Sequence, residues 1–320
     1  METFELLAKK TKKEWKKRTL FISAGTVLLA VVAGFLSWIG LSFLSTKQNQ
    51  QLDDYYYQRT TIAFPNMQRD NIRVTFAHHL GGHYEANLIK DIDGISVKYE
   101  EIEADFSVMK WNHDSLATFV LPSSVEQDST EMAYSYKSHQ KAALFFNPKA
   151  SYGSEDVIRK PAQELPYLAQ MKGQLVEVAI SFDKQYTLAE LKEKLPKNLK
   201  ANWYWIGSVG TENTAHKAIS HLFGWAPRKQ WPNPSYQEFY NLLETFSHSK
   251  EYREMGQGGL AEDVKAHLAS KGEVGKATFG GVILTGKAEN FAQLENQDWI
   301  FASSIGASIP NQPYYQLDVE

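Results

Sequence analysis

The pattern of hydrophobic and polar positions changes twice along this chain. A first stretch, from Thr19 to Thr46, contains no charged residue. From about residue 60 to 150, short apolar runs alternate with polar residues and are separated by turn residues, which is typical of strands. From residue 151 onward, strand-like runs alternate with short helical segments. The pattern predicts an α+β protein with an apolar N-terminal helix, a mostly β juxtamembrane region and an α+β domain.

The uncharged stretch is long enough to cross a bilayer. A hydrocarbon core about 30 Å thick needs about 20 helical residues, and residues 19–46 exceed that length. A cleavable signal peptide has a shorter apolar region, of about 7–15 residues, and a small-x-small exit. Here the bulky Phe43 and Leu44 occupy the exit. We therefore predict a retained transmembrane helix over residues 19–46 rather than a signal peptide.

The charges on either side of the span predict its orientation. Seven lysine and arginine residues lie within the first 18 positions, whereas only Lys47 lies close behind the span. Basic residues favour the cytoplasmic side, so residues 1–18 are expected to form a cytoplasmic tail and the rest to lie outside the cell. The outer chain is acidic overall, which gives no electrostatic basis for direct contact with nucleic acid.

Residues 47–150 are predicted to form a stalk and a β-rich domain. Asp93-Gly94 supplies the residues that a tight hairpin turn requires. The Phe-Pro-Asn sequence at 64–66 ends any preceding helix. The strand-like runs cover residues 71–77, 84–90, 95–101, 104–110, 118–124 and 141–148.

Residues 151–320 are predicted to form an α+β domain. A helical segment over 151–172, interrupted by prolines, leads into two strand–helix–strand halves at 174–208 and 277–308. Two such halves indicate a ferredoxin-like layer of four antiparallel strands with helices on one face. Two further helices are expected as an insertion between the halves.

Local sequence signals mark several elements of this domain. Capping boxes are predicted for Thr187 with Glu190 and for Ser235 with Glu238, and Gly272 is a candidate helix C-cap. The "NWYWIG" run at 202–207 is expected to be a buried aromatic strand rather than an exposed stacking platform.

No local signature indicates catalysis, a cofactor or a metal. The chain has no cysteine, which removes disulfides, thiolate nucleophiles and cysteine-type zinc sites. The Gly81-Gly82 turn and the lack of zinc spacing favour a structural loop for the residues that could ligate a metal, namely His78, His79, His83 and Glu85. A hydrolase built from dispersed residues stays open because catalytic triads are assembled in space, but nothing favours an enzyme.

Two regions together resemble the sigma factor regulators, which are membrane-anchored bacterial proteins typified by anti-sigma factors for extracytoplasmic-function sigma factors. Residues 5–105 resemble the N-terminal family region through the basic tail, the span, "TKQNQQLDDYY", "AFPN" and "KDIDG". Residues 155–310 resemble the C-terminal family region through "VEVAISFDKQYTLAELKEKLPKNLKANWYWIG" and "GGVILTGKAENFAQLENQDWIFASSIGAS".

The resemblance implies signalling rather than catalysis. The cytoplasmic part would restrain a sigma factor, directly or through a second membrane protein, and the outer domains would sense the envelope or support assembly. The extracellular ligand and the particular sigma factor are left open. The alternative is an extracytoplasmic binding or scaffold protein of the cell envelope without direct sigma contact.

Two helical faces are candidate partner-binding sites. In the tail, Phe4, Leu7, Ala8, Thr11 and Trp15 share one face of a predicted helix. This face either binds a sigma factor or lies on anionic lipid with Trp15 at the boundary, and its basic flanks favour lipid slightly.

The second face lies in the span. Ala30 and Gly34 form a small-xxx-small pair that could pack against another membrane helix. Such pairs are common by chance, so an ordinary lipid-facing position is the simpler interpretation.

Overall fold

The computed structural model describes two compact units. The first unit comprises residues 1–52, 74–84 and 104–113, and the second comprises residues 53–73, 85–103 and 114–320. The described residues are 2–113, 119–120, 134–135, 138–153, 158, 160–217, 219–227, 235–255 and 259–312.

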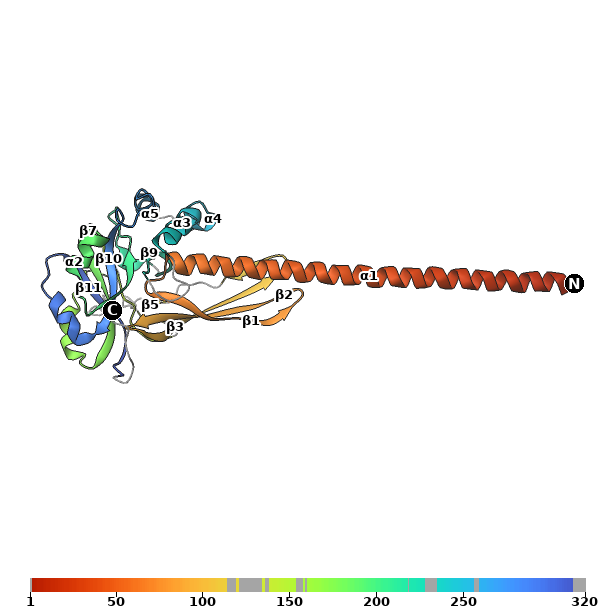
Figure 1. Ribbon diagram of the computed structural model, residues 1–320, viewed down its shortest axis with the longest axis horizontal. Helices are drawn as coiled ribbons and strands as arrows, with labels where there is room; N and C mark the ends of the chain where they lie inside the picture. The colour runs from red at the N-terminus through yellow and green to blue at the C-terminus, as the bar shows by residue number, and fades with distance from the viewer. Residues whose placement is uncertain are drawn as a thin grey trace. The chain divides into compact units, whose positions relative to one another are not determined.

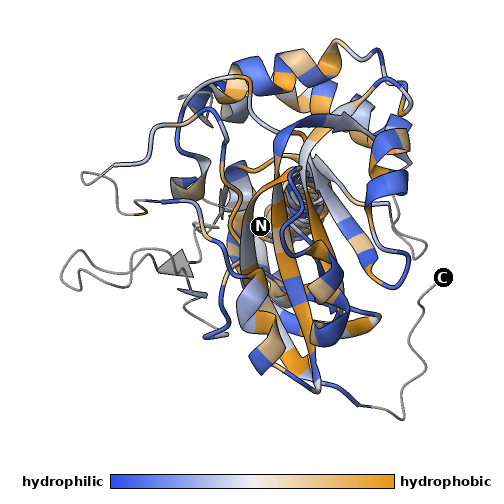
Figure 2. Ribbon diagram, turned by 90° about the vertical axis from the view of Figure 1, so that its left-hand side faces the viewer, coloured by the Kyte–Doolittle hydropathy of each residue, from blue (hydrophilic) through white to orange (hydrophobic). Residues whose placement is uncertain are grey.

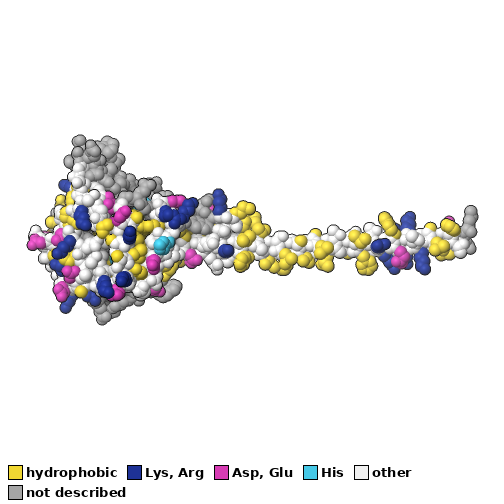
Figure 3. All heavy atoms as spheres, turned by 90° about the horizontal axis from the view of Figure 1, so that it is seen from above, with side chains coloured by type: hydrophobic (Ala, Val, Ile, Leu, Met, Phe, Trp, Pro, Cys, Tyr) yellow, Lys and Arg dark blue, Asp and Glu magenta, His cyan; other side chains and the backbone are white. Residues whose placement is uncertain are grey.

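Helix α1 (Glu2–Ile62) begins the chain and contains the predicted span. It is long and apolar enough to cross a membrane. Figure 3 shows basic side chains near its N-terminal end, followed by apolar ones. The helix also continues through the stretch predicted as a stalk. It ends at Ile62 because Pro65 follows and because Phe64 and Asn66 adopt positive φ angles of 64° and 55°, which no helix accommodates.

A four-stranded sheet follows α1. Its strands are β1 (Met67–His78), β2 (Gly81–Ile92), β3 (Ile95–Ser107) and β4 (Trp111–His113), in the order β1-β2-β3-β4.

The turn between β2 and β3 is the predicted hairpin. Asp93 and Gly94 have φ angles of 54° and 90°, as a type I′ turn requires. The prediction of a separate strand over 104–110 is wrong. Residues 104–107 continue β3, and Ser107 then closes a turn by donating its N–H to the carbonyl of Lys110.

The segment 141–148 is buried but forms no strand of a sheet. Its side chains alternate between two core clusters, with Phe145 in one and Phe146 in the other, but the predicted strand is wrong. Its backbone is instead bonded by side chains: Phe146 N donates to Ser181 Oγ, and Thr214 Oγ1 donates to Phe145 O, both at 2.8 Å. Among the described residues of 118–124, only β5 (Phe119–Val120) is a strand, paired with β6 (Tyr134–Ser135).

The C-terminal domain has a five-stranded sheet in the order β11-β7-β10-β8-β9. Its first four neighbours are antiparallel and follow the ferredoxin-like order, fourth, first, third and second, which confirms the predicted layer. Residues 175–182 of β7 and 279–286 of β10 are buried, and the central strands of the sheet are largely hydrophobic (Figure 2). The elements are β7 (Gln174–Thr187), α2 (Leu188–Lys194), β8 (Lys200–Trp205), β9 (Gly224–Trp225), β10 (Thr278–Lys287), η4 (Ala288–Leu294) and β11 (Ile300–Pro310).

The predicted helical insertion lies between β8 and β10 (Figure 1). Both predicted capping boxes are present, at Thr187 before α2 and at Ser235 before α3. Gly272 is not the C-cap, because α5 ends at Leu268 and Ala269 caps it. The inserted elements are η2 (Thr214–His216), η3 (Ile219–His221), β9, α3 (Tyr236–Ser247), α4 (Lys250–Met255) and α5 (Leu260–Leu268).

The described part of 151–172 contains no α-helix, contrary to the prediction. The 3₁₀ helix η1 (Leu165–Gln170) begins beside Pro166, and residues 154–157 and 159 lie outside the described residues. Ahead of η1, the chain is held extended against β11. Glu164 N donates to Ser303 O, and Ser303 N donates to Ala162 O. These strand-like bonds replace the bonds that a helix would need.

The aromatic strand β8 is buried, as predicted. Trp203 and Trp205 both lie against Phe145, with ring centroids 5.7 and 5.1 Å away. Tyr204 faces the other way and stacks on Trp225 at 6.0 Å. These rings form core rather than an exposed platform.

Candidate functional site

The tail residues predicted to bind a partner lie on one face of α1. In an α-helix, positions 4, 7, 11 and 15 fall on one side. Phe4, Leu7 and Trp15 are exposed, and Thr11 Oγ1 donates to the carbonyl of Leu7 at 2.9 Å. The structure brings these residues together as a surface, and their binding role stays a prediction.

The span residues Ala30 and Gly34 lie one helical turn apart on an open part of α1. A Cβ atom placed on Gly34 would meet nothing within 4 Å. The surface is therefore available to another helix, and its use stays a prediction.

Arg59 fixes the C-terminal end of α1 within the second unit. Its Nη2 donates to the carbonyl of Ser220 at 2.6 Å, and its guanidinium carbon lies 5.2 Å from the ring centroid of Phe246 in α3. Arg59 is buried, so the charge-assisted hydrogen bond and the cation–π contact act in a low dielectric. Burial lowers the pKa of His221, and the charges of Arg59 and Lys217 lower it further.

The sequence contained a signal for this buried helix end. Leu52, Tyr56 and Arg59 recur at helical spacing and are all buried. The polar residues of "DDYYYQR" made this periodicity hard to recognise, so a stalk was predicted instead of a buried helix end.

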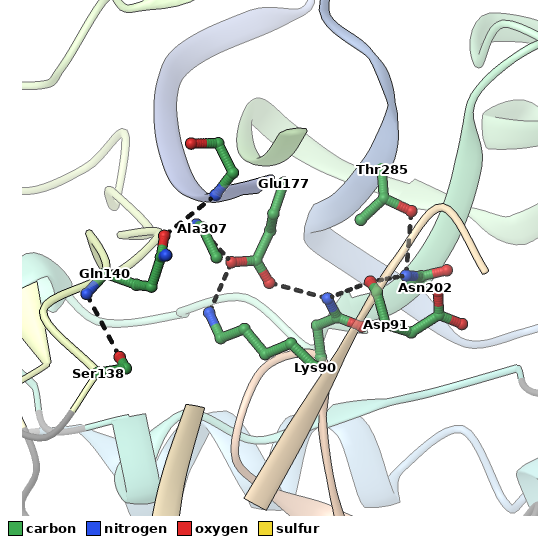
Figure 4. A network of polar contacts seen from close by, with 10 residues as sticks. Lys90, Asp91, Ser138, Gln140, Glu177, Asn202, Thr285 and Ala307 are labelled. Atoms are coloured by element: carbon green, nitrogen blue, oxygen red, sulfur yellow. Dashed lines mark hydrogen bonds and ion pairs between the residues drawn. The ribbon is translucent and has the colours of Figure 1, made fainter. Parts of the chain in front are cut away.

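Glu177 of β7 and Lys90 of β2 form a buried ion pair. Lys90 Nζ lies 2.5 Å from Glu177 Oε2, and both side chains are almost inaccessible to solvent. The carboxylate also accepts from Ala307 N at 3.2 Å and from Asn66 Nδ2 at 2.9 Å (Figure 4). The ammonium lies 4.1 Å from the ring centroid of Tyr99. Buried charges need such a set of partners, so the end of β2 is fixed to the five-stranded sheet.

Asp91, the residue after Lys90 in β2, makes further polar contacts with the five-stranded sheet. Its Oδ2 accepts from Lys200 Nζ at 2.7 Å, and its carbonyl accepts from Asn202 Nδ2 at 2.8 Å and from Asn66 Nδ2 at 2.9 Å. Asn202 also donates to Thr285 Oγ1 at 3.1 Å. The polar junction, defined here as Asn66, Lys90, Asp91, Glu177, Lys200, Asn202 and Thr285, therefore ties the hairpin to β7, β8 and β10.

This junction was not predicted from the sequence. The available signal was a charge inside a strand-like run, since Lys90 ends "YEANLIK" and Glu177 lies within "QLVEVAISF". A charge at a core position of a strand requires a buried partner, but periodicity alone does not say which residue that partner is.

Asp263 of α5 contacts the loop that follows β8. Its Oδ1 accepts from Val209 N at 2.5 Å. Burial raises the pKa of Asp263 to about 6, Glu212 adds to the rise, and the Val209 N–H and Lys217 oppose it. The insertion therefore carries a carboxyl group that changes its charge near neutral pH.

A cavity of about 440 Å³ lies in the second unit, between the end of α1 and the start of β1. Its lining includes Asp53, Tyr57, Arg69 and Trp203. Arg69 Nη1 lies 2.5 Å from Asp53 Oδ1, and the guanidinium carbon lies 5.7 Å from the Tyr57 ring centroid. The volume suits a small molecule, although Asp53 and Arg69 are already paired with each other.

Of the histidines in "AHHLGGHYE", His78 stabilises the turn between β1 and β2, and His83 of β2 pairs with β3. His78 Nδ1 accepts from Leu80 N at 3.1 Å, and His83 Nδ1 lies 2.7 Å from Asp105 Oδ1. Across the part of the chain that the structure describes, no group of three histidine or acidic residues is placed to hold a metal ion.

The apolar helix and the mixed domain define a single-pass membrane protein with an α+β globular region. Residues 168–307 match the family described as sigma factor regulator C-terminal. The match supports the predicted sigma factor regulator family and, with it, an anti-sigma regulatory role with a sigma factor as partner. The family is a regulatory class rather than an enzymatic one. No curated protein and no solved structure matches the chain.

Proposed function

We propose that this chain restrains an extracytoplasmic-function sigma factor from the membrane. The observation that carries the proposal is the sigma factor regulator domain on a chain whose apolar helix has basic residues on its N-terminal side. The basic flank supports a cytoplasmic N-terminus. On this proposal residues 1–18 are the cytoplasmic tail, 19–46 the span, 47–150 the stalk and β-rich region, and 151–320 the extracytoplasmic C-terminal domain.

In this proposal, α1 links the two sides of the membrane. Its tail face contacts the sigma factor, and Ala30 with Gly34 packs against the helix of a second membrane protein. Its C-terminal end is bonded through Arg59 to the insertion of the C-terminal domain. A ligand or an envelope signal that alters this domain would change the restraint on α1.

Leucines at adjacent positions allow a sharp test of the tail. Leu7 lies on the predicted partner face and Leu6 on the opposite side, and they are 62% and 66% exposed. We expect the full-length protein, purified in detergent, to retain a sigma factor. Leu7→Asn should lose it, whereas Leu6→Asn should keep it. Equal retention by both variants would argue against this face, and repeated failure of the wild type to retain any sigma factor would argue against the regulator.

The alternative function is an envelope scaffold whose tail only anchors it. The seven basic residues of the tail favour it, because such a segment binds anionic lipid without a protein partner. Exchanging residues 1–18 for an unrelated basic sequence distinguishes the two functions. Retained function with normal membrane insertion supports the scaffold, and lost function supports a specific cytoplasmic contact.

A further inference from the structure

Two turns of the four-stranded sheet meet in the first unit and form an exposed apolar tip. We define the hairpin tip as residues 76–82 and 106–110. Val108 N donates to Leu80 O at 2.9 Å and joins the two turns. A Cβ atom on Gly81 would collide with the carbonyl oxygen of Phe106, so only glycine permits this close approach.

The hairpin tip exposes large apolar side chains. Phe76 is 85% exposed and Met109 is 88% exposed, and Leu80 is also exposed. Phe76 has a φ angle of 49°, which bulky residues rarely adopt. Three exposed apolar groups, at the end of β1 and on the two joined turns, form a surface whose contact with water is unfavourable.

A direct contact places this tip beside the end of the membrane span. Ser45 of α1 is only 5% exposed and donates its hydroxyl to the carbonyl of His78 at 3.3 Å. Residues 3–40 of α1 are exposed throughout, and the first partly buried position is Leu41. The hairpin tip therefore contacts α1 where its bare, apolar part ends.

The length of the span sets the level of this contact in the bilayer. Counting about 20 residues from Leu20, the hydrocarbon core ends near residue 40. The headgroup region adds roughly 5–7 Å, or about four helical residues. Ser45 then lies at headgroup level, and so does the hairpin tip that is bonded to it.

We propose that Phe76, Leu80 and Met109 insert into the headgroup and acyl boundary of the bilayer that surrounds α1. The occupant is lipid because the bilayer must cover α1 up to the level at which the tip contacts it. Large apolar side chains gain free energy at this boundary. The tip would fix the distance of the sheet from the membrane, a role that holds whichever side of the membrane it faces and whether or not a sigma factor binds.

The absence of cysteine from the chain allows a clean depth measurement. Phe76→Cys and Met109→Cys, each in the full-length protein, are labelled with an environment-sensitive fluorophore and placed in lipid nanodiscs with or without brominated lipids. Phe43→Cys, an exposed position of α1 at the headgroup level counted above, is the positive control. Tyr167→Cys, an exposed position of η1, is the negative control.

We expect brominated lipid to quench the labels at 76 and 109 strongly, as it quenches the label at 43, and to leave the label at 167 unchanged. Unquenched labels at 76 and 109 beside a quenched label at 43 would overturn the proposal. A blue-shifted but unquenched label would also overturn it, since that result means that protein covers the tip. Neither result depends on the sigma factor, so the regulatory proposal is tested separately.

Discussion

A few residues with buried charges join the elements of this protein to one another. Glu177 and Lys90 are buried together, and Arg59 is buried against backbone and aromatic groups. Each such group costs free energy to desolvate and is retained only with its partners. Changes at these positions are therefore expected to have far larger effects than changes to surface charges.

The first prediction concerns the buried pair. Lys90→Met leaves the carboxylate of Glu177 buried without its cation, and we expect the free energy of unfolding to fall by roughly 3–5 kcal/mol. The matched control is Lys98→Met, which removes the cation of an exposed pair with Glu101 and should cost about 0–1 kcal/mol. Urea unfolding of the full-length protein in detergent measures both. Adding Glu177→Gln to Lys90→Met should recover part of the loss, and equal losses in the two single variants would contradict the buried-pair argument.

The second prediction concerns pH. Because the pKa of Asp263 is raised from 3.8 to about 6, the folded protein keeps this proton to a higher pH than the unfolded chain does. The contribution of Asp263 to stability therefore falls as pH rises from about 4 to 6. Asp263→Asn removes this loss, so its stability relative to the wild type should rise by on the order of 1 kcal/mol between pH 5 and 7.

Thermal unfolding at each pH tests that difference. Asp298→Asn at an exposed position of the same domain controls for the loss of one negative charge. A difference between Asp263→Asn and the wild type that stays constant with pH would show that this carboxyl group does not titrate in the stated range.

At the scale of elements, structures that depend on neighbouring residues were predicted correctly, whereas structures that depend on distant hydrogen-bond partners were not. The capping residues Thr187 and Ser235 and the Asp93-Gly94 turn act within a few residues, so their sequence determines them. The segment 141–148 and the chain before η1 show the opposite case. The strand predicted over 141–148 and the helix predicted before η1 are wrong, because Ser181 and Ser303, which are far away in sequence, bond the backbone of these segments.

The candidate site follows the same division. The apolar stretch of α1 and the shared face of Phe4, Leu7 and Trp15 depend on residues of one helix, so they can be predicted from the sequence alone. The polar junction joins Asn66 and Lys90 to Glu177 across long separations. One sequence identifies a charge in a strand but not the distant residue that neutralises it.

The third prediction tests a cap. Ser235→Ala removes the side chain that accepts from Glu238 N at the start of α3, so we expect a loss of about 1 kcal/mol in stability. Thr245→Ala, within the same helix, removes only a hydroxyl that bonds back to Asn241 O and should be nearly neutral. Urea unfolding distinguishes them, and a cost as large for Thr245→Ala would assign the effect to general helix loss rather than to the cap.

At the scale of the whole molecule, membrane orientation decides what the sigma factor regulator domain can do. If the basic tail is cytoplasmic, only residues before the span reach a sigma factor, and the matched domain acts at a distance through α1. If the orientation is reversed, the matched domain itself faces the cytoplasm and could bind directly. The charge difference across the span favours the first arrangement.

The fourth prediction decides between these arrangements. The chain has no cysteine, so a cysteine introduced in place of Lys10 or Tyr167 is the only one in each variant. Tyr167 is exposed in η1. We expect a membrane-impermeant maleimide to label Tyr167→Cys in intact cells and to label Lys10→Cys only after lysis, because the positive tail is retained inside. The reverse labelling pattern would overturn the extracytoplasmic placement but would leave the family match unchanged. The domain at 168–307 would then lie in the same compartment as the sigma factor. It could therefore act on the sigma factor without a signal through α1.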